Sequence, residues 1–387
     1  MRTAPHGGRL INRELSEADR TRRAAEVAHL PKLHPSIDDL YDVQQLGIGG
    51  YSPLEGFMDH ATFERVLTKT RLANDLPWSM PIVLTPPGAE NARVIAGLKA
   101  GDEAAILDDK DRLIAILHLS EKFQPDRKAW AQSTYATTET AHPNVADVMA
   151  TGDVALAGSI DLVHRLELPT GSDEMGPAET RALFDAKGWG RVAAYQCRNP
   201  PHTAHEYLQR LTLERQDVDA LLIHPVVGRL KKGDYRPDVI LAAYRALVKN
   251  YHVPSRVHLA AFSITMRYAG PRAALFLAIV RKNYGCSSYI VGRDQAGVGK
   301  YYDPYACHRI FDEFPVGIDA LCYDEAWLCK KCGWMATMKT CPHPKEDRVD
   351  TSQTRIRKAL SEGQPLPAEI LRPEVAEILR QPDVVQN

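Results

Sequence analysis

A guanidinium, two imidazoles and two side-chain amides lie within one short segment, Tyr195-Gln196-Cys197-Arg198-Asn199-Pro200-Pro201-His202-Thr203-Ala204-His205-Glu206. Arg198 offers a planar fork that matches sulfate, phosphate or carboxylate. The prolines are typical of the first turn of a helix, and His202 and His205 then share one face of that turn. Because a helix N-terminus carries free N–H groups and a positive dipole end, these residues favour a nucleotide phosphate site. A chance pair, with one histidine capping and one buried, is the alternative.

A second segment, Gly292-Arg293-Asp294-Gln295-Ala296-Gly297-Val298-Gly299, follows an apolar run. Its glycines allow the backbone to approach a ligand closely, but their spacing is not that of the dinucleotide fingerprint. A surface turn is the alternative, and the position at the end of a buried strand favours a site. Between the two segments, Lys231 and Arg267 are candidates to neutralise phosphate charge or, equally, solvated surface charges.

Four potential metal ligands lie near the C-terminus, in the pattern Cys329-x2-Cys332-x8-Cys341-x-His343. Four nitrogen and sulfur donors are what a closed tetrahedral zinc site requires, so the sequence predicts a structural Zn²⁺ without a reactive water. A disulfide is the alternative. The other four cysteines lack such spacing.

The apolar runs indicate how these segments are positioned. Runs at 80–84, 92–98, 103–109 and 112–119 predict a β-rich barrel or sandwich in residues 1–165, with a helical patch at 61–73. After a Pro-, Gly- and Ser-containing linker at 167–180, strands at 191–196, 219–227, 256–263 and 288–294 alternate with helices. This alternation predicts a doubly wound parallel sheet with ligands at the carboxyl ends of its strands. The Cys-rich tail from about 326 ends in helical segments.

The composition places the chain in a broad class. A hydrophobic fraction of 44% with 25% charged residues is ordinary for a globular protein, and a net charge of -1 gives no broad basic field for nucleic acid. We see neither an apolar stretch long enough to span a membrane nor a secretory signal. Seven cysteines are too few for a disulfide scaffold. We therefore expect a cytoplasmic protein without nucleic-acid or membrane partners.

Taken together, these segments resemble the ATP sulfurylase (sulfate adenylyltransferase) family, in its zinc-bearing bacterial and archaeal form. Residues 49–58, GGYSPLEGFM, look like the N-terminal signature of the family, and residues 196–205 match its QxRNPxHxxH motif. Residues 266–272 and Gly292-Arg293-Asp294 follow in the expected order, and residues 352–357 match a helix start beyond the zinc ligands. The fold implied is α/β, with a PUA-like N-terminal domain (1–168), a Rossmann-like nucleotidyltransferase domain (169–325) and a small zinc-bearing C-terminal domain (326–387).

The resemblance implies that ATP and sulfate form adenylyl sulfate and pyrophosphate, in either direction, with Mg²⁺ accompanying ATP. It also implies a homo-oligomer, a dimer by family resemblance. The residues implied are, for catalysis, Cys197, Arg198, Asn199, His202 and His205; for sulfate, Gln196, Arg198 and the backbone near Ala296; and for ATP, Gln196, Cys197, Arg198, Asn199, Gly292, Arg293, Asp294, Gln295 and Ala336.

The chain departs from the family pattern at four positions. Gln295 replaces a histidine and cannot become cationic, Cys197 replaces a threonine, Leu277 stands where relatives often carry histidine, and Thr203 where they often carry a basic residue. An active sulfate adenylyltransferase is the leading hypothesis. An adenylyltransferase with an organic acceptor and a non-catalytic homologue that binds nucleotide or a partner protein are the alternatives.

Overall fold

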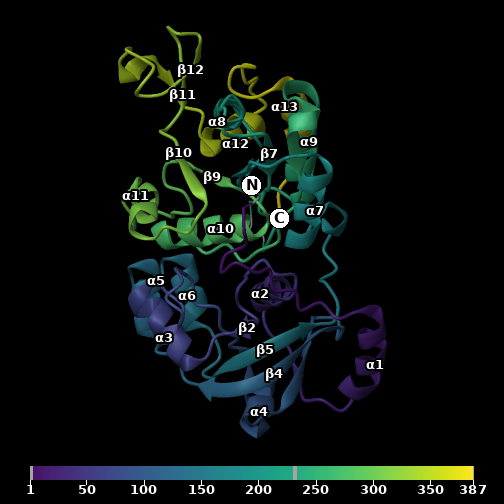
Figure 1. Ribbon diagram of the computed structural model, residues 1–387. Coiled ribbons are helices and arrows are strands. Elements are labelled where there is room, and N and C mark those ends of the chain that lie inside the picture. Colours follow the sequence, from purple (N-terminus) through teal and green to yellow (C-terminus); the bar gives the residue numbers. More distant parts are fainter. Residues whose placement is uncertain (1–2, 230–232, 387) are drawn as a thin grey trace.

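A computed structural model describes residues 3–229 and 233–386 of the chain. Two five-stranded sheets form separate layers, the mixed sheet of the N-terminal half and the parallel sheet of the second half (Figure 1). The Cys-rich hairpin, residues 327–336, projects at the end of the molecule opposite the N-terminal sheet (Figure 1). Lys231 falls outside the described residues.

The N-terminal domain is built around a mixed sheet with the strand order β1-β3-β4-β5-β2. Its strands are β1 (Lys32–Leu33), β2 (Gly56–Phe57), β3 (Glu103–Leu107), β4 (Leu113–Phe123) and β5 (Ala155–Leu162). Its helices are α1 (Glu17–Val27), α2 (Ile37–Gly47), α3 (His60–Lys69), α4 (Ala89–Gly97), α5 (Arg127–Tyr135) and α6 (Pro143–Met149). The β-rich expectation is confirmed for this sheet.

Two of the strands predicted in this domain are absent. Residues 92–98 lie mostly in α4, where Asn91 and Ile95 are buried four positions apart, as on one face of a helix. Residues 80–84 are buried but make a single β-bridge, from Leu84 to Leu156, and form no strand. A short apolar run does not by itself distinguish a strand from a buried helix or an extended segment.

The second domain contains the predicted parallel sheet, with every neighbouring pair of strands parallel. Its strands are β6 (Val192–Tyr195), β7 (Ala220–Ile223), β8 (Val257–Leu259), β9 (Ser288–Val291) and β10 (Asp319–Cys322). Its helices are α7 (Pro177–Ala186), α8 (Thr203–Leu213), α9 (Pro237–Tyr251), α10 (Pro271–Asn283) and α11 (Ala306–Glu313), with 3-10 turns η1 (Gly171–Asp173) and η2 (Pro254–Arg256).

The strand order β10-β9-β6-β7-β8 places a topological switch between β6 and β9. The chain leaves β6 toward β7 on one side, whereas β9 lies on the other side. In open parallel sheets, ligands bind in the crevice outside the carboxyl ends of the strands at such a switch. Both motif segments begin there, one directly after β6 and the other directly after β9.

The C-terminal residues form a hairpin and two helices. The strands β11 (Trp327–Cys329), β12 (Trp334–Ala336) and β13 (Arg348–Val349) make a small sheet with the turn η3 (Lys345–Asp347). The helices α12 (Gln353–Ser361) and α13 (Pro373–Leu379) follow, and their apolar residues Ile356, Val375 and Leu379 belong to the same buried cluster as Leu221 and Tyr244 of the parallel-sheet domain.

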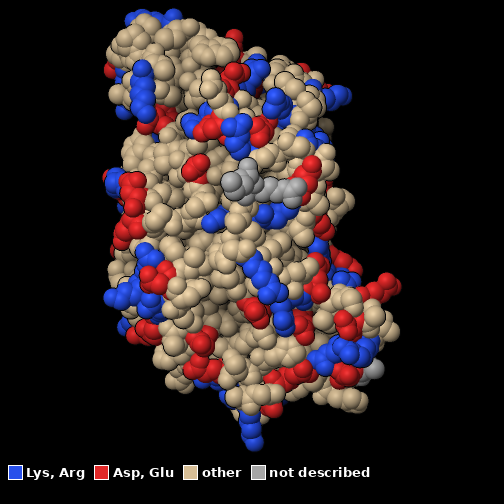
Figure 2. Space-filling view, viewed as in Figure 1, with Lys and Arg blue, Asp and Glu red and all other residues tan. Residues whose placement is uncertain are grey.

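Charges of both signs alternate over the face of the molecule in Figure 2, in agreement with the net charge of -1. No helix in the described part of the chain is both long and apolar enough to cross a membrane.

Candidate active site

The two motif segments line one cleft of about 430 Å³ at the switch point of the parallel sheet. From the first segment, Gln196, Cys197, Arg198, Asn199 and His205 face it. From the second come Gly292, Arg293, Asp294, Gln295, Ala296 and Gly297. The structure therefore brings together residues almost one hundred positions apart in the sequence, as the parallel sheet predicts.

Arg198 lies in the wall of this cleft rather than in open solvent. Its Nη2 contacts the Oδ2 of Asp234 at 3.0 Å, and its guanidinium carbon lies 5.4 Å from the centre of the Tyr268 ring. Burial, with the positive charges of Arg357 and Arg229 nearby, lowers the pKa of Arg198, and Asp234 opposes this effect. A guanidinium has five donors, so one contact with Asp234 leaves donors for a bound anion.

The two histidines stack on each other at the start of α8, with ring centres 3.7 Å apart. His205 lines the cleft, whereas the buried His202 lies outside its lining and supports the His205 ring. Burial and the neighbouring His205 lower the pKa of His202 well below its usual value, so His202 is neutral at pH 7. The Nδ1 atoms of both rings have no hydrogen-bond partner among the described residues.

Cys197 faces the cleft beside His205, with 3.9 Å between its Sγ and the His205 Nε2. Burial alone would raise the pKa of this thiol. The charge of His205 and hydrogen bonds from His205, the Asn199 N–H and Tyr244 outweigh burial and lower the pKa to about 7. The thiolate is therefore accessible at neutral pH, unlike that of an ordinary cysteine.

The side-chain amides of the two turns are each held from behind. The Oε1 of Gln196 accepts a hydrogen bond of 2.5 Å from Arg281, and the Nε2 of Gln295 donates to the hydroxyl of Tyr289 at 3.1 Å. Asn199 is held from the C-terminal helix α12, since its Oδ1 accepts from Arg357 at 2.9 Å.

The second turn has an unusual backbone. Asp294 and Ala296 both have a positive φ, of 55° and 56°, a region that few residues other than glycine adopt. A Cβ on Gly297 would lie 2.1 Å from the Oδ1 of Asp294, so a larger residue there would displace the Asp294 carboxylate. Such local strain is common at ligand-binding sites.

The N-terminal domain holds a further wall of the cleft, the segment Met266–Tyr268. Asn144 at the start of α6 accepts a hydrogen bond of 2.8 Å from the Tyr268 N–H and donates to the Met266 carbonyl at 3.3 Å. His142 and Tyr302 both lie within hydrogen-bond distance of the Tyr268 carbonyl, at 3.0 and 2.9 Å. Met266 and Tyr268 thus line the cleft in a conformation that hydrogen bonds from the N-terminal domain help to fix.

Arg267 points away from the cleft, so neither proposed role for its charge is correct. It is buried at the domain interface in an ion pair with Asp42 of α2, whose other carboxylate oxygen accepts a hydrogen bond of 2.8 Å from Tyr51. Although burial opposes the charge, Asp42 raises the pKa of Arg267 above its usual value.

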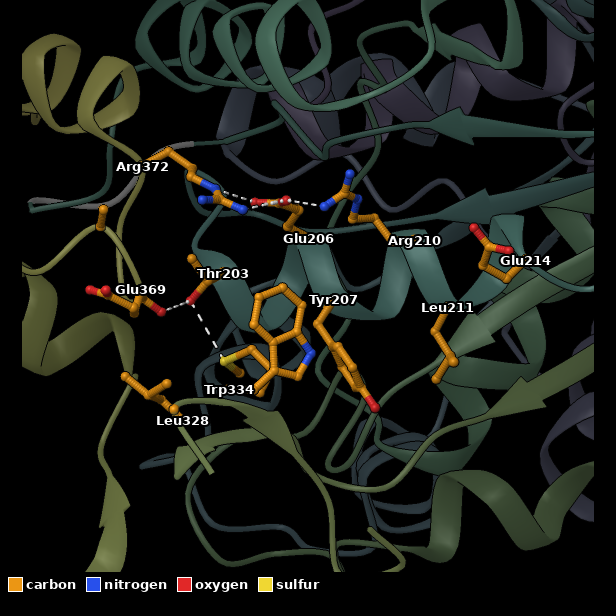
Figure 3. Close-up of a pocket in the computed structure, with 13 residues that line it drawn as sticks. Thr203, Glu206, Tyr207, Arg210, Leu211, Glu214, Leu328, Trp334, Glu369 and Arg372 are labelled. Atoms are coloured by element: carbon orange, nitrogen blue, oxygen red, sulfur yellow. Dashed lines mark hydrogen bonds and ion pairs between the residues drawn. The ribbon is translucent and has the colours of Figure 1, made fainter. Parts of the chain in front are cut away.

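Two of the four departures from the family pattern do not face the cleft. Leu277 is buried in the main hydrophobic cluster. Thr203 points into a separate groove of about 510 Å³ between α8, the β11–β12 hairpin and the C-terminal segment (Figure 3). There its hydroxyl donates to the Glu369 carbonyl at 2.6 Å. Gln295 and Cys197 are the departures that alter the cleft itself.

The predicted ATP contact Ala336 is not among the residues that line the cleft. It is 4% exposed and packs with Trp327 and Cys329 in the hairpin, while its neighbour Met335 faces the groove of Figure 3. In that groove Glu206 forms two hydrogen bonds with Arg372, at 2.7 and 2.8 Å.

Sequence reasoning missed a further stretch of the cleft lining, Asp324, Glu325 and Ala326. These residues follow β10, an edge strand that was not predicted. The carboxylate of Glu325 lies 3.6 Å from Arg293. Had β10 been predicted as a fifth parallel strand, the residues that follow it would have been expected at the cleft, because the carboxyl ends of parallel strands meet at one edge of the sheet.

The four predicted metal ligands converge at the turn of the β11–β12 hairpin and in the loop that follows β12. The Sγ atoms of Cys329, Cys332 and Cys341 and a ring nitrogen of His343 all lie within 4.8 Å of one another. The disulfide alternative is wrong, because all three of these cysteines are free. The Sγ atoms of Cys332 and Cys341, for example, are 3.8 Å apart, whereas a disulfide bond is about 2.05 Å long. This donor set can hold a metal ion.

Comparison with known proteins identifies the family. The ATP-sulfurylase family model matches residues 173–382, and the PUA-like domain model matches residues 3–165. A sulfate adenylyltransferase of Hyperthermus butylicus is 44% identical over 380 residues, which cover 98% of this chain and 96% of the relative. The chain belongs to the ATP-sulfurylase family. It also resembles a sulfate adenylyltransferase of Aeropyrum pernix, at 43% identity over 99% of each chain.

A solved structure gives the same assignment of fold. The structure described as hexameric APS kinase from Thiobacillus denitrificans has a TM-score of 0.76 and 25% identity, covering 98% of this chain and 68% of that chain. The PUA-like N-terminal domain and the parallel-sheet nucleotidyltransferase domain of this ATP-sulfurylase family member are therefore those expected from the sequence.

Proposed function

We propose that the chain is a sulfate adenylyltransferase, which joins ATP and sulfate to form adenylyl sulfate and releases pyrophosphate. The observation that carries the proposal is the convergence of Arg198 and the 292–297 turn on one cleft at the switch point of the sheet. Family membership and the full-length similarity to sulfate adenylyltransferases support it.

The reaction brings together two anions. A sulfate oxygen attacks the α-phosphorus of ATP, the bond from that phosphorus to the bridging oxygen breaks, and pyrophosphate leaves with the bonding electrons. Sulfate is a weak nucleophile, so catalysis rests on positioning the reactants and stabilising charge rather than on a protein nucleophile. The cleft supplies cationic and neutral donors for this purpose.

We assign the individual roles from the family resemblance, and the position of these residues at the cleft supports the assignment. Arg198, Gln196 and the backbone near Ala296 hold sulfate. Cys197, Asn199, Gly292, Arg293, Asp294 and Gln295 hold ATP together with Gln196 and Arg198. His205, supported by the neutral His202, donates a hydrogen bond to the phosphates. Ala336 has no part in this proposal, because it does not line the cleft.

We also propose that the protein uses two metal ions. Mg²⁺ enters with ATP and neutralises phosphate charge, with ATP oxygens and water as its main ligands. The hairpin holds a structural Zn²⁺. Tetrahedral zinc with ordinary bond lengths places its sulfur ligands about 3.8 Å apart and sulfur and nitrogen about 3.6 Å apart. The Cys332–Cys341 distance is 3.8 Å, and the Cys329–His343 and Cys332–His343 distances are 3.4 and 3.3 Å.

Further parts of the proposal concern the whole protein. The proposed domains are residues 1–168, 169–325 and 326–387, and the proposed assembly is a homodimer. The proposed location is the cytoplasm, and the seven free cysteines support a reducing compartment. The same cleft serves the reaction in either direction, the formation of adenylyl sulfate or the formation of ATP.

The test is the release of pyrophosphate from MgATP by the purified chain, measured as the phosphate that added inorganic pyrophosphatase forms from it. We expect release that depends on inorganic sulfate, and about one equivalent of zinc per chain by metal analysis. Release without sulfate, or only with an organic acid, would favour the adenylyltransferase with an organic acceptor. Nucleotide binding without any release would favour the non-catalytic homologue.

A further inference from the structure

A fully buried arginine lies directly behind the cleft. Arg281 of α10 is 0% exposed, and its guanidinium carbon lies 3.8 Å from the centre of the Phe262 ring. Its Nη2 donates to the Oε1 of Gln196, while Nε and Nη1 have no hydrogen-bond partner among the described residues. An uncompensated buried charge is costly in free energy, so a protein retains one only with a compensating gain.

The titratable groups around Arg281 do not supply a negative charge. They are Tyr284, Tyr289 and Cys286, together with His224 from the end of β7. Burial raises the pKa of both Tyr289 and Cys286 to about 12, and it raises that of Tyr284 as well. Burial and the charge of Arg281 lower the pKa of His224. At neutral pH this region carries one positive charge and, among the described residues, no anion paired with it.

The hydrogen bond to Gln196 has a directional consequence. Because a guanidinium has only donors, it fixes which end of the Gln196 amide is the oxygen. Because the amide oxygen faces Arg281, the amide NH₂ of Gln196 is the group that remains to donate hydrogen bonds in the cleft. Tyr289, which lies beside Arg281, accepts the hydrogen bond from Gln295 of the second turn. The same buried region therefore underlies both turns.

We propose that Arg281 is a positioning residue for sulfate: it orients the Gln196 amide toward the oxyanion, and its unpaired charge favours an anion in the cleft. The inference rests on the proposed function, and it concerns the sulfate end of the cleft rather than the nucleotide end. The cost of burying Arg281 in the empty protein is offset when the dianion binds.

A merely structural arginine has different surroundings, as Arg272 of the same helix shows. Arg272 donates to the carbonyl oxygens of Ser79 and Val66 in the N-terminal domain, at 2.9 and 2.6 Å. Its bonds hold two domains together and do not reach the cleft. Arg272 is therefore the matched control for Arg281.

The experiment compares the wild-type chain with Arg281→Met, Arg281→Lys and Arg272→Met. Two readouts are measured, the KM values for sulfate and for ATP, and the thermal unfolding midpoint with and without inorganic sulfate. For Arg281→Met we expect the sulfate KM to rise at least tenfold, the ATP KM to change less than twofold, and the sulfate-induced rise of the midpoint to disappear. Without sulfate, its midpoint should equal or exceed that of the wild type.

Arg281→Lys keeps the charge but not the fork, so it should raise the sulfate KM by a smaller factor and retain part of the sulfate-induced shift. Arg272→Met should lower the midpoint without changing the ratio of the two KM values. A sulfate KM within twofold of wild type in Arg281→Met, or an equal rise in both KM values, overturns the inference. If Arg281→Met does not fold, an unchanged sulfate response in Arg281→Lys overturns it as well.

The outcome is separable from that of the proposed function. A wild-type chain without turnover contradicts the proposed function, whereas the sulfate-induced shift in wild type and its loss in Arg281→Met still test the anion site. An active Arg281→Met with an ordinary sulfate KM contradicts this inference alone.

Discussion

Arg267 at the domain interface and Arg281 behind the cleft are both buried arginines, but the charges around them differ. Arg267 pairs with the carboxylate of Asp42, and nearby Arg229 contacts Asp38 and Asp147 at 2.7 and 2.9 Å. Arg281 has no carboxylate partner among the described residues, and its one bonded neighbour is a neutral amide. A carboxylate thus balances the buried charge of Arg267, although its Nη1 has no hydrogen-bond partner among the described residues. The charge of Arg281 is balanced, on our proposal, only when an anion binds in the cleft.

The comparison separates two uses of the same side chain. Paired arginines hold the PUA-like domain against the nucleotidyltransferase domain, and through Asn144 and His142 this contact shapes the Met266–Tyr268 wall. The arginines at the cleft, Arg198 in its wall and Arg281 behind it, are the ones that we propose to serve the ligand. Substitutions at the interface should therefore affect folding first, and substitutions at the cleft should affect turnover first.

The largest effect is expected at the interface, for Asp42→Asn. The substitution leaves the Arg267 guanidinium buried without a counter-charge, which typically costs about 3–5 kcal/mol. Urea unfolding should show a midpoint well below that of the wild type, and Arg267→Met added to Asp42→Asn should recover part of the loss. Asp217→Asn, in an exposed pair with Arg215, is the control and should leave the midpoint unchanged. A wild-type midpoint in Asp42→Asn would break the comparison.

The next effect is expected at the cleft, for Arg198→Ala. Loss of one preorganised donor to a developing charge lowers turnover by about 10²–10³-fold. The urea midpoint should stay close to that of the wild type, because the guanidinium is partly exposed and only one ion pair is lost. Arg215→Ala, remote from the cleft, should leave both quantities unchanged. If Arg198→Ala keeps turnover within tenfold of wild type, its assigned role is wrong.

The smallest effect concerns Cys197, the cleft thiol whose pKa is lowered to about 7. Since the thiolate is the reactive form, its alkylation by iodoacetamide should increase with pH around a midpoint near 7. A small free thiol should show a midpoint near its ordinary pKa of about 8.5. Peptide mass spectrometry measures the extent of modification, and MgATP should slow it. A midpoint near 8.5 at Cys197 would show that the pair with His205 does not favour the thiolate.

The parallel sheet and the meeting of the two motif segments could be predicted from the sequence. Buried strands such as 192–195 and 288–291 are short, mainly apolar runs, and helices separate them in the chain. Once the strands are parallel, residues that follow them meet at one edge. Strand β10 was not predicted because only Leu321 of its four residues is buried, so it lacks an apolar run, as is usual for a strand at the edge of a sheet.

The roles of the buried arginines could not be predicted. Asp42 and Arg267 are 225 positions apart, and Arg281 and Gln196 are 85 apart, so neither contact has a local pattern. In the sequence, Arg281 is one of two adjacent cations at the end of a helix, which is the usual composition of an exposed helix terminus. The difference between the two arginines arises only from packing.

The account as a whole is tested most directly by the formation of ATP from adenylyl sulfate and pyrophosphate in the presence of Mg²⁺. We expect the purified chain to produce ATP only when both substrates are present, and Arg198→Ala to lose nearly all of this production. A folded, zinc-loaded chain that binds ATP but forms none from adenylyl sulfate and pyrophosphate would contradict the central claim.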